Sequence, residues 1–435
     1  MNDSSNKNRK FGFETRMIHA GHIPDAVTGA RAVPIYQTTS YVFDSADYAA
    51  QLFDLKQYGN IYTRISNPTT AVLEERIASL EGATGALAVS SGMAAQFIAF
   101  MTLLNPGDEI VASRHLYGGT VTQLTHTMQK LSIKVTFVDP SDINAWEAAM
   151  TSKTKALFGE TIGNPRGSIL DISKIADLAR SKRVPLIIDS TFATPYLCRP
   201  MEFGASIVVH SATKFLGGHG SSIGGVIVDS GNFDFSHYPT IAAPSPSYHG
   251  LRFFDTFGHY GFLMKARAET LRDVGSCISP TNAFMLLQGV ETLSLRMDRH
   301  VGNALAVARY LKSKAEVEWV AYAGLEDHPD YELAKKYLPK GPGAVFSFGL
   351  KNDKGQARES GKKFIEALQI FSHLANVGDV RSLVIHPAST THQQLSDEEL
   401  TAGGVGPELI RLSIGLENVE DLLWDLEQGF FAASR

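Results

Sequence analysis

The chain has 435 residues, 44% of them hydrophobic, which is the composition of a globular protein with two or three domains. Its formal net charge is −5 and it has no basic stripe with interleaved aromatic residues, which argues against a nucleic-acid partner. Cys198 and Cys277 are too few for a disulfide framework or a multi-cysteine metal site, so we expect free thiols. The polar start of the sequence, without a run of about 20 apolar residues anywhere, predicts a cytoplasmic protein.

The first 67 residues show little helical periodicity. Residues 2–9 are polar and are predicted to be disordered, and the stretch from Phe11 to Tyr62 contains Pro34 and several aromatic side chains. Such a segment is better suited to wrapping around a neighbouring molecule than to forming a domain. We therefore expect residues 1–67 to be an arm.

A regular α/β pattern begins at Pro68. Leu73, Ile77 and Leu80 share one helical face, and Gly82 is placed to end that helix. Apolar strand-like runs then alternate with helical stretches, at Glu109–Ala112, Val135–Val138, Ala156–Phe158, Leu186–Ile188, Ile207–Val209 and Val226–Val228. Between two of them lies a helical stripe made by Ile172, Ile175, Ala176 and Ala179. This alternation predicts a mostly parallel, doubly wound α/β sheet, which binds ligands at the C-terminal ends of its strands.

The rest of the chain is divided into three stretches. Residues 229–262 lose periodicity and are rich in Gly, Pro, Ser, His and aromatic residues, which we interpret as a long functional loop. Helical periodicity returns over residues 262–314. A smaller α+β unit is predicted to follow, with strands at 344–348, 383–385 and 409–414 and helices at 355–368 and 419–431.

A lysine and an aspartate carry the strongest chemical signal. Lys214 lies in the run from His210 to Phe215, and the strand of residues 184–188 ends in Asp189. Pyridoxal phosphate (PLP) is held by a lysine as a Schiff base, and a carboxylate keeps its ring nitrogen protonated so that the ring accepts carbanion charge. The hydroxyl groups of Ser211 and Thr213 are placed to bond a phosphate. Taken singly, the lysine is explained as a solvated charge and the aspartate as a helix cap, but their combination favours a PLP site.

Weaker signals lie nearer the N-terminus. Ser91, Gly92 and Met93 form a turn into an apolar helix, whose first amides suit a phosphate, although small residues also permit tight packing. Tyr117, before two glycines, is either a ring that covers an aromatic cofactor or an ordinary half-buried tyrosine. Arg64, beside Tyr62, suits an anion or is simply solvated.

Near the C-terminus, Arg411 interrupts an apolar strand. A buried arginine needs a partner, and a substrate carboxylate is one candidate. His386 and His392 invite a metal site, but no carboxylate or cysteine cluster supports one, so we expect loop or core histidines and no metal.

The motifs together resemble the cysteine and methionine metabolism family of PLP-dependent enzymes, fold type I, over about residues 16–429. The matching strings are Tyr62–Arg64 with Asn67–Thr69, Ser91–Met93, Tyr117–Gly119, Glu160–Thr161 with Asn164–Pro165, Asp189, Ser211–Lys214 and His386–Ala388 with Thr391–His392. The resemblance implies a mostly parallel seven-stranded sheet flanked by helices, with a smaller C-terminal α+β domain. It also implies a PLP-binding domain over 68–280, a second domain over 281–435, and an arm that contacts the neighbouring subunit of a tetramer built as a dimer of dimers.

The resemblance also assigns roles to individual residues. Lys214 is expected to bind PLP covalently and to move protons, assisted by Tyr117, which stacks on the ring, while Asp189 holds the ring nitrogen. The remaining cofactor contacts are Asn164 at the 3′ oxygen, then Gly92, Met93, Ser211 and Thr213 at the phosphate of the same subunit, and Tyr62 and Arg64 at the phosphate of the neighbouring subunit. Arg411 is expected to hold the substrate carboxylate, with Asn376 as a further candidate.

Within the family, the chain is most similar to the O-acetylhomoserine sulfhydrylase branch. The insertion at 229–262 and the string Ala375–Asp379 favour this branch, and Gly119 stands where methionine γ-lyases often place a cysteine. The implied reaction replaces the acetate of O-acetylhomoserine by sulfide or methanethiol. Cystathionine γ-synthase, methionine γ-lyase, O-succinylhomoserine sulfhydrylase and a non-catalytic PLP-binding protein are the alternatives.

Overall fold

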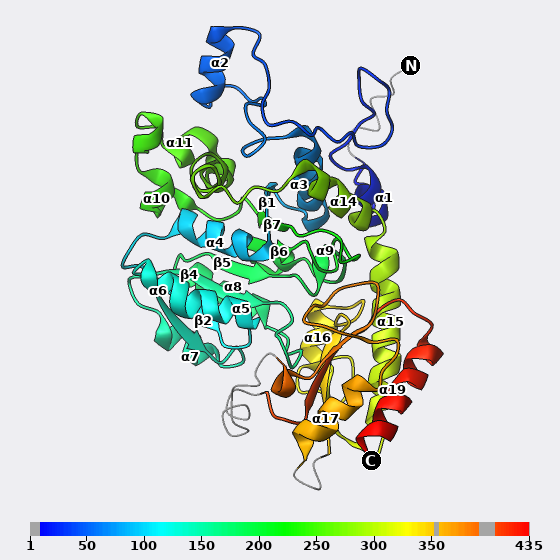
Figure 1. The fold of residues 1–435 in the computed structure, drawn as a ribbon. Coiled ribbons are helices and arrows are strands. Elements are labelled where there is room, and N and C mark those ends of the chain that lie inside the picture. The colour runs from blue at the N-terminus through cyan, green and yellow to red at the C-terminus, as the bar shows by residue number, and fades with distance from the viewer. Residues whose placement is uncertain (1–8, 352–355, 391–404, 435) are drawn as a thin grey trace.

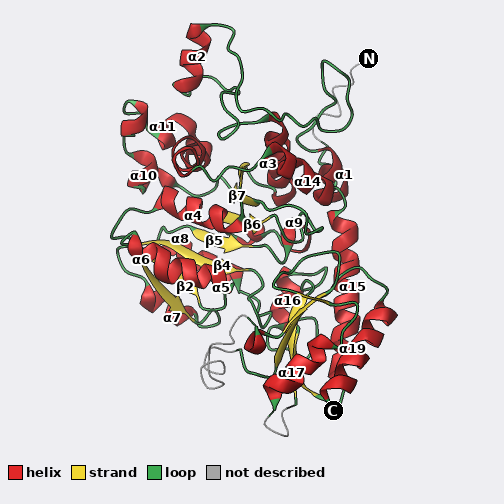
Figure 2. Cartoon of the chain, in the orientation of Figure 1, coloured by secondary structure: helices red, strands yellow, loops and turns green. Residues whose placement is uncertain are grey.

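Two β-sheets organise the chain in the computed structural model, which describes residues 9–351, 356–390 and 405–434. The larger sheet lies in the middle of the molecule with helices on both faces, and the smaller one lies near the C-terminus (Figures 1 and 2). The long helix α15 (Leu293–Lys312) runs along the side of the molecule, from the level of the larger sheet down past the smaller one (Figure 1). Disorder is predicted for residues 2–9, and residues 2–8 of this range lie outside the described residues.

The larger sheet has seven strands in the order β1-β7-β6-β5-β4-β2-β3. Their bounds are β1 Gly85–Val89, β2 Glu109–Ser113, β3 Lys134–Val138, β4 Thr154–Glu160, β5 Leu186–Asp189, β6 Ile207–Ser211 and β7 Gly225–Asp229. Only β7 runs against its neighbours, antiparallel to both β1 and β6. The prediction of a mostly parallel seven-stranded sheet is therefore confirmed. Strand β1 was missed, because three of its five residues are Gly or Ala, which have little strand preference.

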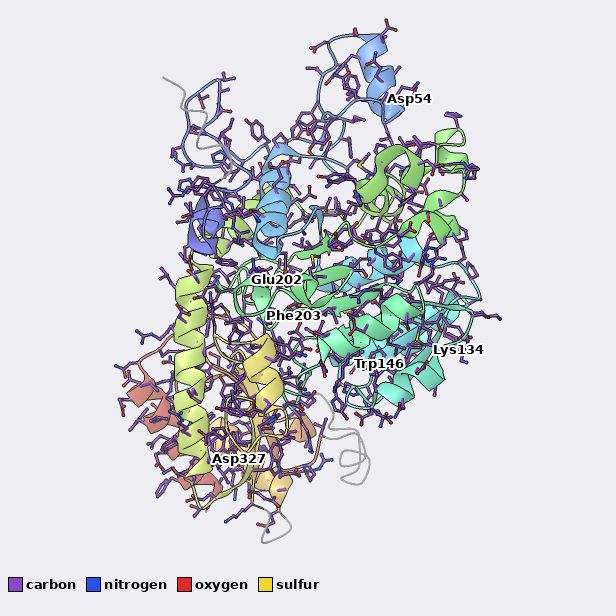
Figure 3. All side chains as sticks on the ribbon, turned by 180° about the vertical axis from the view of Figure 1, so that it is seen from behind. Asp54, Lys134, Trp146, Glu202, Phe203 and Asp327 are labelled. Carbon is purple, nitrogen blue, oxygen red and sulfur yellow. The ribbon has the colours of Figure 1, made fainter. Side chains whose placement is uncertain are left out.

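Helices cover both faces of this sheet because successive strand residues point to opposite sides. In β4, for example, Leu157 packs into one core and its neighbours Ala156 and Phe158 into the other. The first core is shared with α3 (Pro68–Glu81), α7 (Ile143–Ala149), α8 (Ile172–Ser181) and α14 (Pro280–Val290). Figure 3 shows its buried Trp146, on α7, from behind. The second core is shared with α4 (Gly92–Leu103) and with the π-helix η2 (Gln123–Thr127), which follows α5 (Gly118–Thr122) and leads into α6 (Met128–Lys130).

Helix α3 shows how local sequence sets the ends of an element. The side-chain oxygen of Asn67 accepts hydrogen bonds from the amides of Thr69 and Thr70, and Pro68 occupies the first turn. Gly82 ends the helix with φ of 71°, a conformation that favours glycine. The predicted helix from Pro68 to Gly82 is thus confirmed.

The smaller sheet has five strands in the order β10-β11-β12-β9-β8. They are β8 Val317–Ala321, β9 Val345–Leu350, β10 Ser372–His373, β11 Leu383–Ile385 and β12 Leu409–Ser413, accompanied by α16 (Tyr331–Tyr337), α17 (Ala357–Glu366) and α19 (Val419–Ala433). The predicted strands at 344–348, 383–385 and 409–414 are confirmed. Edge strand β8 and helix α16 were missed, because each is short and only partly buried.

The segment at 229–262 differs from the loop that we predicted. It folds into short helical turns, namely η4 (Phe235–His237), α10 (Pro239–Ala242), η5 (Pro246–Tyr248), α11 (Phe253–Phe257) and η6 (Gly258–Tyr260). It continues into α12 (Gly261–Lys265), the π-helix η7 (Ala266–Leu271) and α13 (Arg272–Val274). Turns of three to five residues are too short to show helical periodicity. Aromatic packing orders them instead, as in the stacked rings of Phe235 and Phe262, 5.5 Å apart.

The N-terminal arm extends away from the sheets (Figure 1). It contains two short helices that the sequence did not reveal, α1 (Phe13–His19) and α2 (Ala46–Phe53). Several large apolar side chains of the arm are exposed, with Val27 at 93% and Val42 at 98%. No helix among the described residues combines the length and the apolar character needed to cross a membrane.

Candidate active site

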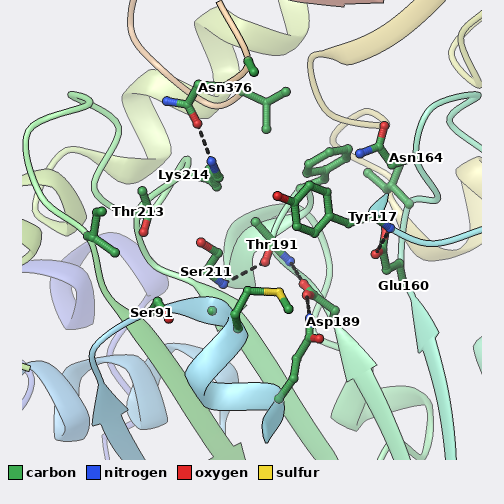
Figure 4. Close-up of a pocket in the computed structure, with 18 of the residues that line it drawn as sticks. Ser91, Tyr117, Glu160, Asn164, Asp189, Thr191, Ser211, Thr213, Lys214 and Asn376 are labelled. Carbon is green, nitrogen blue, oxygen red and sulfur yellow. Dashed lines mark hydrogen bonds between the residues drawn. The ribbon is translucent and has the colours of Figure 1, made fainter. Parts of the chain in front are cut away.

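A cavity of about 260 Å³ lies where β4, β5 and β6 end and α4 begins. The sheet domain supplies most of its lining, and residues 375–377 and Arg411 complete it from the C-terminal part of the chain. The predicted site residues that meet in this cavity are Gly92, Met93, Tyr117, Asn164, Asp189, Ser211, Thr213, Lys214, Asn376 and Arg411. Lys214 and Asn376 lie on one side of it and Asp189 and Thr191 on another (Figure 4).

Asp189 ends strand β5 and is held by two donors. The side-chain amide of Gln96 donates to Oδ2 at 3.0 Å, and the main-chain amide of Thr191 donates to Oδ1 at 2.9 Å. The Thr191 hydroxyl in turn accepts a hydrogen bond of 2.8 Å from the Ser211 amide, which links β5 to β6 (Figure 4). Asp189 therefore keeps one orientation toward the cavity.

Lys214 follows β6 and extends its amine into the cavity, where Nζ donates to the side-chain oxygen of Asn376 (Figure 4). Burial, followed by the nearby positive charge of Arg411, lowers the pKa of the Lys214 amine. A lowered pKa increases the fraction of neutral amine, the form that attacks a carbonyl or accepts a proton.

The beginning of α4 is shaped to receive an anion. Ser91 caps the helix by accepting a hydrogen bond of 3.1 Å from the Ala94 amide. The amides of Gly92 and Met93 have no acceptor inside the helix because they belong to its first turn. A Cβ at Gly92 would lie 2.6 Å from Cβ of Ser211, so only glycine allows α4 to begin this close to β6. Thr213 also borders the cavity, with its hydroxyl bonded to the main chain of Gly224.

Tyr117 stands at the cavity mouth and is 51% exposed. Its amide donates to Oε1 of Glu160 at 2.6 Å, and Glu160 ends strand β4 beside Asp189 (Figure 4). Burial, followed by the charge of Asp189, raises the pKa of the Glu160 carboxyl well above its usual value. A Cβ on Gly119 would overlap the Tyr117 ring, so the glycine leaves room for this ring position.

Arg411, on β12, is a second cation in the lining of the cavity, beside Lys214. Its guanidinium lies 3.4 Å from the side-chain oxygen of Asn164 and 3.5 Å from the main-chain oxygen of Asn376, both long for hydrogen bonds. Among the ion pairs of the described residues, none includes Arg411. It is therefore a largely buried cation placed to receive a carboxylate.

Two predicted site residues lie elsewhere. Tyr62 and Arg64 do not line this cavity but are exposed on the arm, with the guanidinium 5.3 Å from the tyrosine ring centre. His386 is buried, and its two ring nitrogens contact Ser389 Oγ and the Pro407 carbonyl. Thr391 and His392 lie outside the described residues.

Sequence reasoning missed Gln96 and Thr191, which orient Asp189, and it quoted Glu160 only as part of a motif. A signal for Gln96 existed, because a polar residue inside an apolar helix needs a partner.

The donor set of this cavity fits PLP. It offers an amine for the aldehyde, a fixed carboxylate for the ring nitrogen, and free helix-start amides with a serine hydroxyl for the phosphate. An aromatic ring stands beside these groups, and a second cation remains for a substrate carboxylate.

Residues 14–431 match the model of the family described as Cys/Met metabolism PLP-dependent enzyme. The chain belongs to this family of PLP-dependent enzymes. It is similar to O-acetyl-L-homoserine sulfhydrylase of Leptospira meyeri, with 51% identity over 97% of both chains, and to O-acetyl-L-homoserine sulfhydrylase 1 of Thermus thermophilus, with 51% identity over 96% of this chain and 99% of the other.

Solved structures of the family superpose closely on this fold. A crystal structure of a putative O-acetylhomoserine (thiol)-lyase from Campylobacter jejuni, which carries N'-pyridoxyl-lysine-5'-monophosphate, gives a TM-score of 0.92 at 39% identity, over 97% of this chain and all of the other. Cystathionine γ-lyase of Lactobacillus plantarum complexed with L-serine gives 0.83 at 35% identity, over 98% of this chain and all of the other. The expected fold type I architecture is confirmed.

Proposed function

We propose that this enzyme replaces the acetate of O-acetyl-L-homoserine by sulfide or methanethiol, giving homocysteine or methionine. The observation that carries this proposal is the cavity, where Lys214, Asp189 and an arginine without an ion-pair partner among the described residues converge at the strand ends. The sulfhydrylases of similar sequence, at about half identity over the full chain, support the choice of substrate.

Bound PLP supplies an electron sink for negative charge at the substrate α-carbon. Asp189, oriented by Gln96 and Thr191, keeps the ring nitrogen protonated. Lys214, with its lowered pKa, accepts the α-proton and returns protons to the carbon skeleton after acetate has left. Arg411 holds the α-carboxylate so that these transfers occur within a fixed geometry.

The other contacts have supporting tasks. The amides of Gly92 and Met93 and the hydroxyls of Ser211 and Thr213 would hold the phosphate of PLP, and Asn164 would contact its 3′ oxygen; all five residues line the cavity. Tyr117 covers the ring and assists proton transfer near the leaving group. Asn376 accepts a hydrogen bond from the amine of Lys214, so its first role is to hold that amine. The substrate carboxylate is its second proposed partner.

We further propose that the arm of residues 1–67 completes the site of a neighbouring subunit, with the PLP-binding domain over 68–280 and the second domain over 281–435. Tyr62 and Arg64 are exposed and lie outside their own cavity, which leaves them available to the phosphate of a second copy. The exposed apolar residues of the arm support burial against another subunit of a dimer or tetramer.

A purified-protein assay tests the reaction. O-acetylhomoserine is supplied with sulfide, methanethiol or cysteine in separate reactions, and acetate release is measured together with the amino-acid product. Turnover with sulfide or methanethiol supports the proposal. Cystathionine formation from cysteine alone, preference for O-succinylhomoserine, or thiol release from methionine would each identify a different member of the family, and an inert PLP-bound protein would refute catalysis.

A further inference from the structure

The main chain that follows Lys214 rests on a buried arginine from another part of the molecule. Arg296 lies in the first turn of α15 and is only 5% exposed. Its Nη1 donates to the carbonyl oxygen of Phe215 at 2.7 Å, and its Nη2 donates to the carbonyl oxygen of Leu216 at 3.1 Å. The two residues that follow the lysine are thereby fixed to helix α15.

The other donors of Arg296 are also used within the fold. Nη2 reaches the carbonyl oxygen of Gly289 at 2.7 Å, and Nε reaches the hydroxyl of Thr292 at 3.2 Å. None of the ion pairs among the described residues includes Arg296, and burial lowers its pKa to about 10. A buried guanidinium without a carboxylate costs solvation free energy, so its retention here needs an explanation beyond charge pairing.

Three glycines make this arrangement possible. A Cβ on Gly218, whose φ is +74°, would overlap the guanidinium, and a Cβ on Gly289 would overlap the main chain of Gly217. From the opposite side, a Cβ on Gly378 would lie 2.7 Å from the amide nitrogen of Phe215. The segment after Lys214 is thus enclosed between α14, α15 and the loop that carries Asn376.

We propose that Arg296 is a positioning residue for Lys214, which holds the carbonyls of Phe215 and Leu216 so that the lysine amine reaches the cofactor. The lysine side chain is long and flexible, and in each turnover it must leave the cofactor and return to it. A fixed main chain confines this movement to the side chain. A displacement of about 1 Å can reduce such a reaction about 100-fold.

This inference rests on the proposed role of Lys214, and its test uses the formation of the lysine–PLP bond as well as turnover. The amine attacks the PLP aldehyde, a C=N bond forms and one water leaves; borohydride then reduces the bond to a stable secondary amine. PLP is removed from the purified protein and added back, and the rate of the yellow absorbance is recorded. Mass spectrometry locates the reduced product.

Arg296→Met is expected to bind PLP with an affinity within about threefold of the parent, while both the bond-forming rate and kcat fall about 10- to 100-fold. KM for the substrate should change little. Arg296→Lys, with fewer donors, should recover part of the rate. Thr292→Val removes one acceptor of the guanidinium and should cause a smaller loss of the same kind, which gives a second measurement if Arg296→Met does not fold.

Arg76→Met is the matched control. Arg76 is also fully buried, but it pairs with Glu291 at 2.9 Å and donates to the carbonyl of Ala20, and neither of these partners belongs to the segment after Lys214. It should lower the melting temperature and leave the bond-forming rate intact. A bond-forming rate in Arg296→Met and Thr292→Val within twofold of the parent would overturn the inference, as would equal losses in the Arg76 control. A parent that forms the bond but does not convert O-acetylhomoserine would refute the proposed function alone.

Discussion

Replacement of Arg411 by lysine tests the substrate end of the site most directly. Lysine keeps the positive charge but loses the planar fork that bonds both oxygens of a carboxylate. A hydrogen bond to a charged group contributes about 1.5–3 kcal/mol, which corresponds to a loss of about 10- to 150-fold in kcat/KM. Among the described residues, the hydrogen-bond partners of the guanidinium are Asn164 and Asn376, at the long distances of 3.4 and 3.5 Å, so the parent arginine loses little hydrogen bonding when it binds a substrate.

The assay compares kcat/KM for O-acetylhomoserine and for its α-carboxamide, with sulfide as the acceptor. The parent should strongly prefer the acid, and Arg411→Lys should reduce this preference while PLP content stays constant. Arg180→Lys is the control, since that side chain is 69% exposed and forms an ion pair on the surface of α8. The reasoning fails if Arg411→Lys retains the preference of the parent within twofold, or if it loses PLP in proportion to activity.

The remaining predictions concern the cofactor, the arm and two buried carboxyls. Lys214→Ala should abolish the yellow absorbance and acetate release, and measurable turnover would contradict its role. Arg64→Ala should weaken PLP retention. When Arg64→Ala subunits are mixed with Lys214→Ala subunits, activity should return, because a hybrid oligomer contains one site with an intact Arg64 and an intact Lys214. No recovery would argue against shared sites. Burial raises the pKa of Glu160, so the neutral isostere Glu160→Gln should keep the bond to the Tyr117 amide and kcat within about threefold; a loss above tenfold would indicate that the charge is needed. Burial also raises the pKa of Asp229 to about 7, so the folded protein should lose stability as the pH rises from about 4 to 7, by at most about 1.4 kcal/mol per pH unit. Asp229→Asn removes this loss, so the melting temperature of the variant relative to the parent should rise from pH 4 to pH 7. A difference in melting temperature that does not change with pH would contradict this prediction.

The sequence predicted the residues that carry the chemistry. Lys214 and Asp189 each have an ordinary structural explanation taken singly, and it was their combination with two nearby hydroxyl residues that predicted a cofactor site. Arg411 was noticed because a charged side chain interrupts an apolar strand. The structure brings these three side chains to one cavity. Parallel strands explain why Asp189 and Lys214 meet, because the carboxyl ends of β5 and β6 lie at the same edge of the larger sheet. Arg411 comes from β12 of the smaller sheet, so only the packing of the two sheets brings it to the cavity.

The supporting residues were harder to predict because their contacts join distant parts of the chain. Gln96 is 93 residues from Asp189, and Arg296 is 81 residues from Phe215. Both lie in helices whose periodicity accounts for the apolar neighbours and leaves the polar side chain unexplained. In each case the partner is a strand end or a turn, and only the fold determines which one it is.

The reacting residues were easier to predict than the orienting residues for a physical reason. The reacting groups need particular side-chain types, and the combination of these types along the sequence reveals them. The groups that orient them need only a donor at the right distance, which any of several side chains can supply from any neighbouring element. Gln96 donates its side-chain amide N–H to a carboxylate, and Arg296 donates its guanidinium N–H groups to main-chain carbonyls. The lysine and the aspartate can act on one cofactor only if both side chains are held in the right orientation. Gln96 and Arg296 do not react themselves, but by holding that orientation they can still affect the rate.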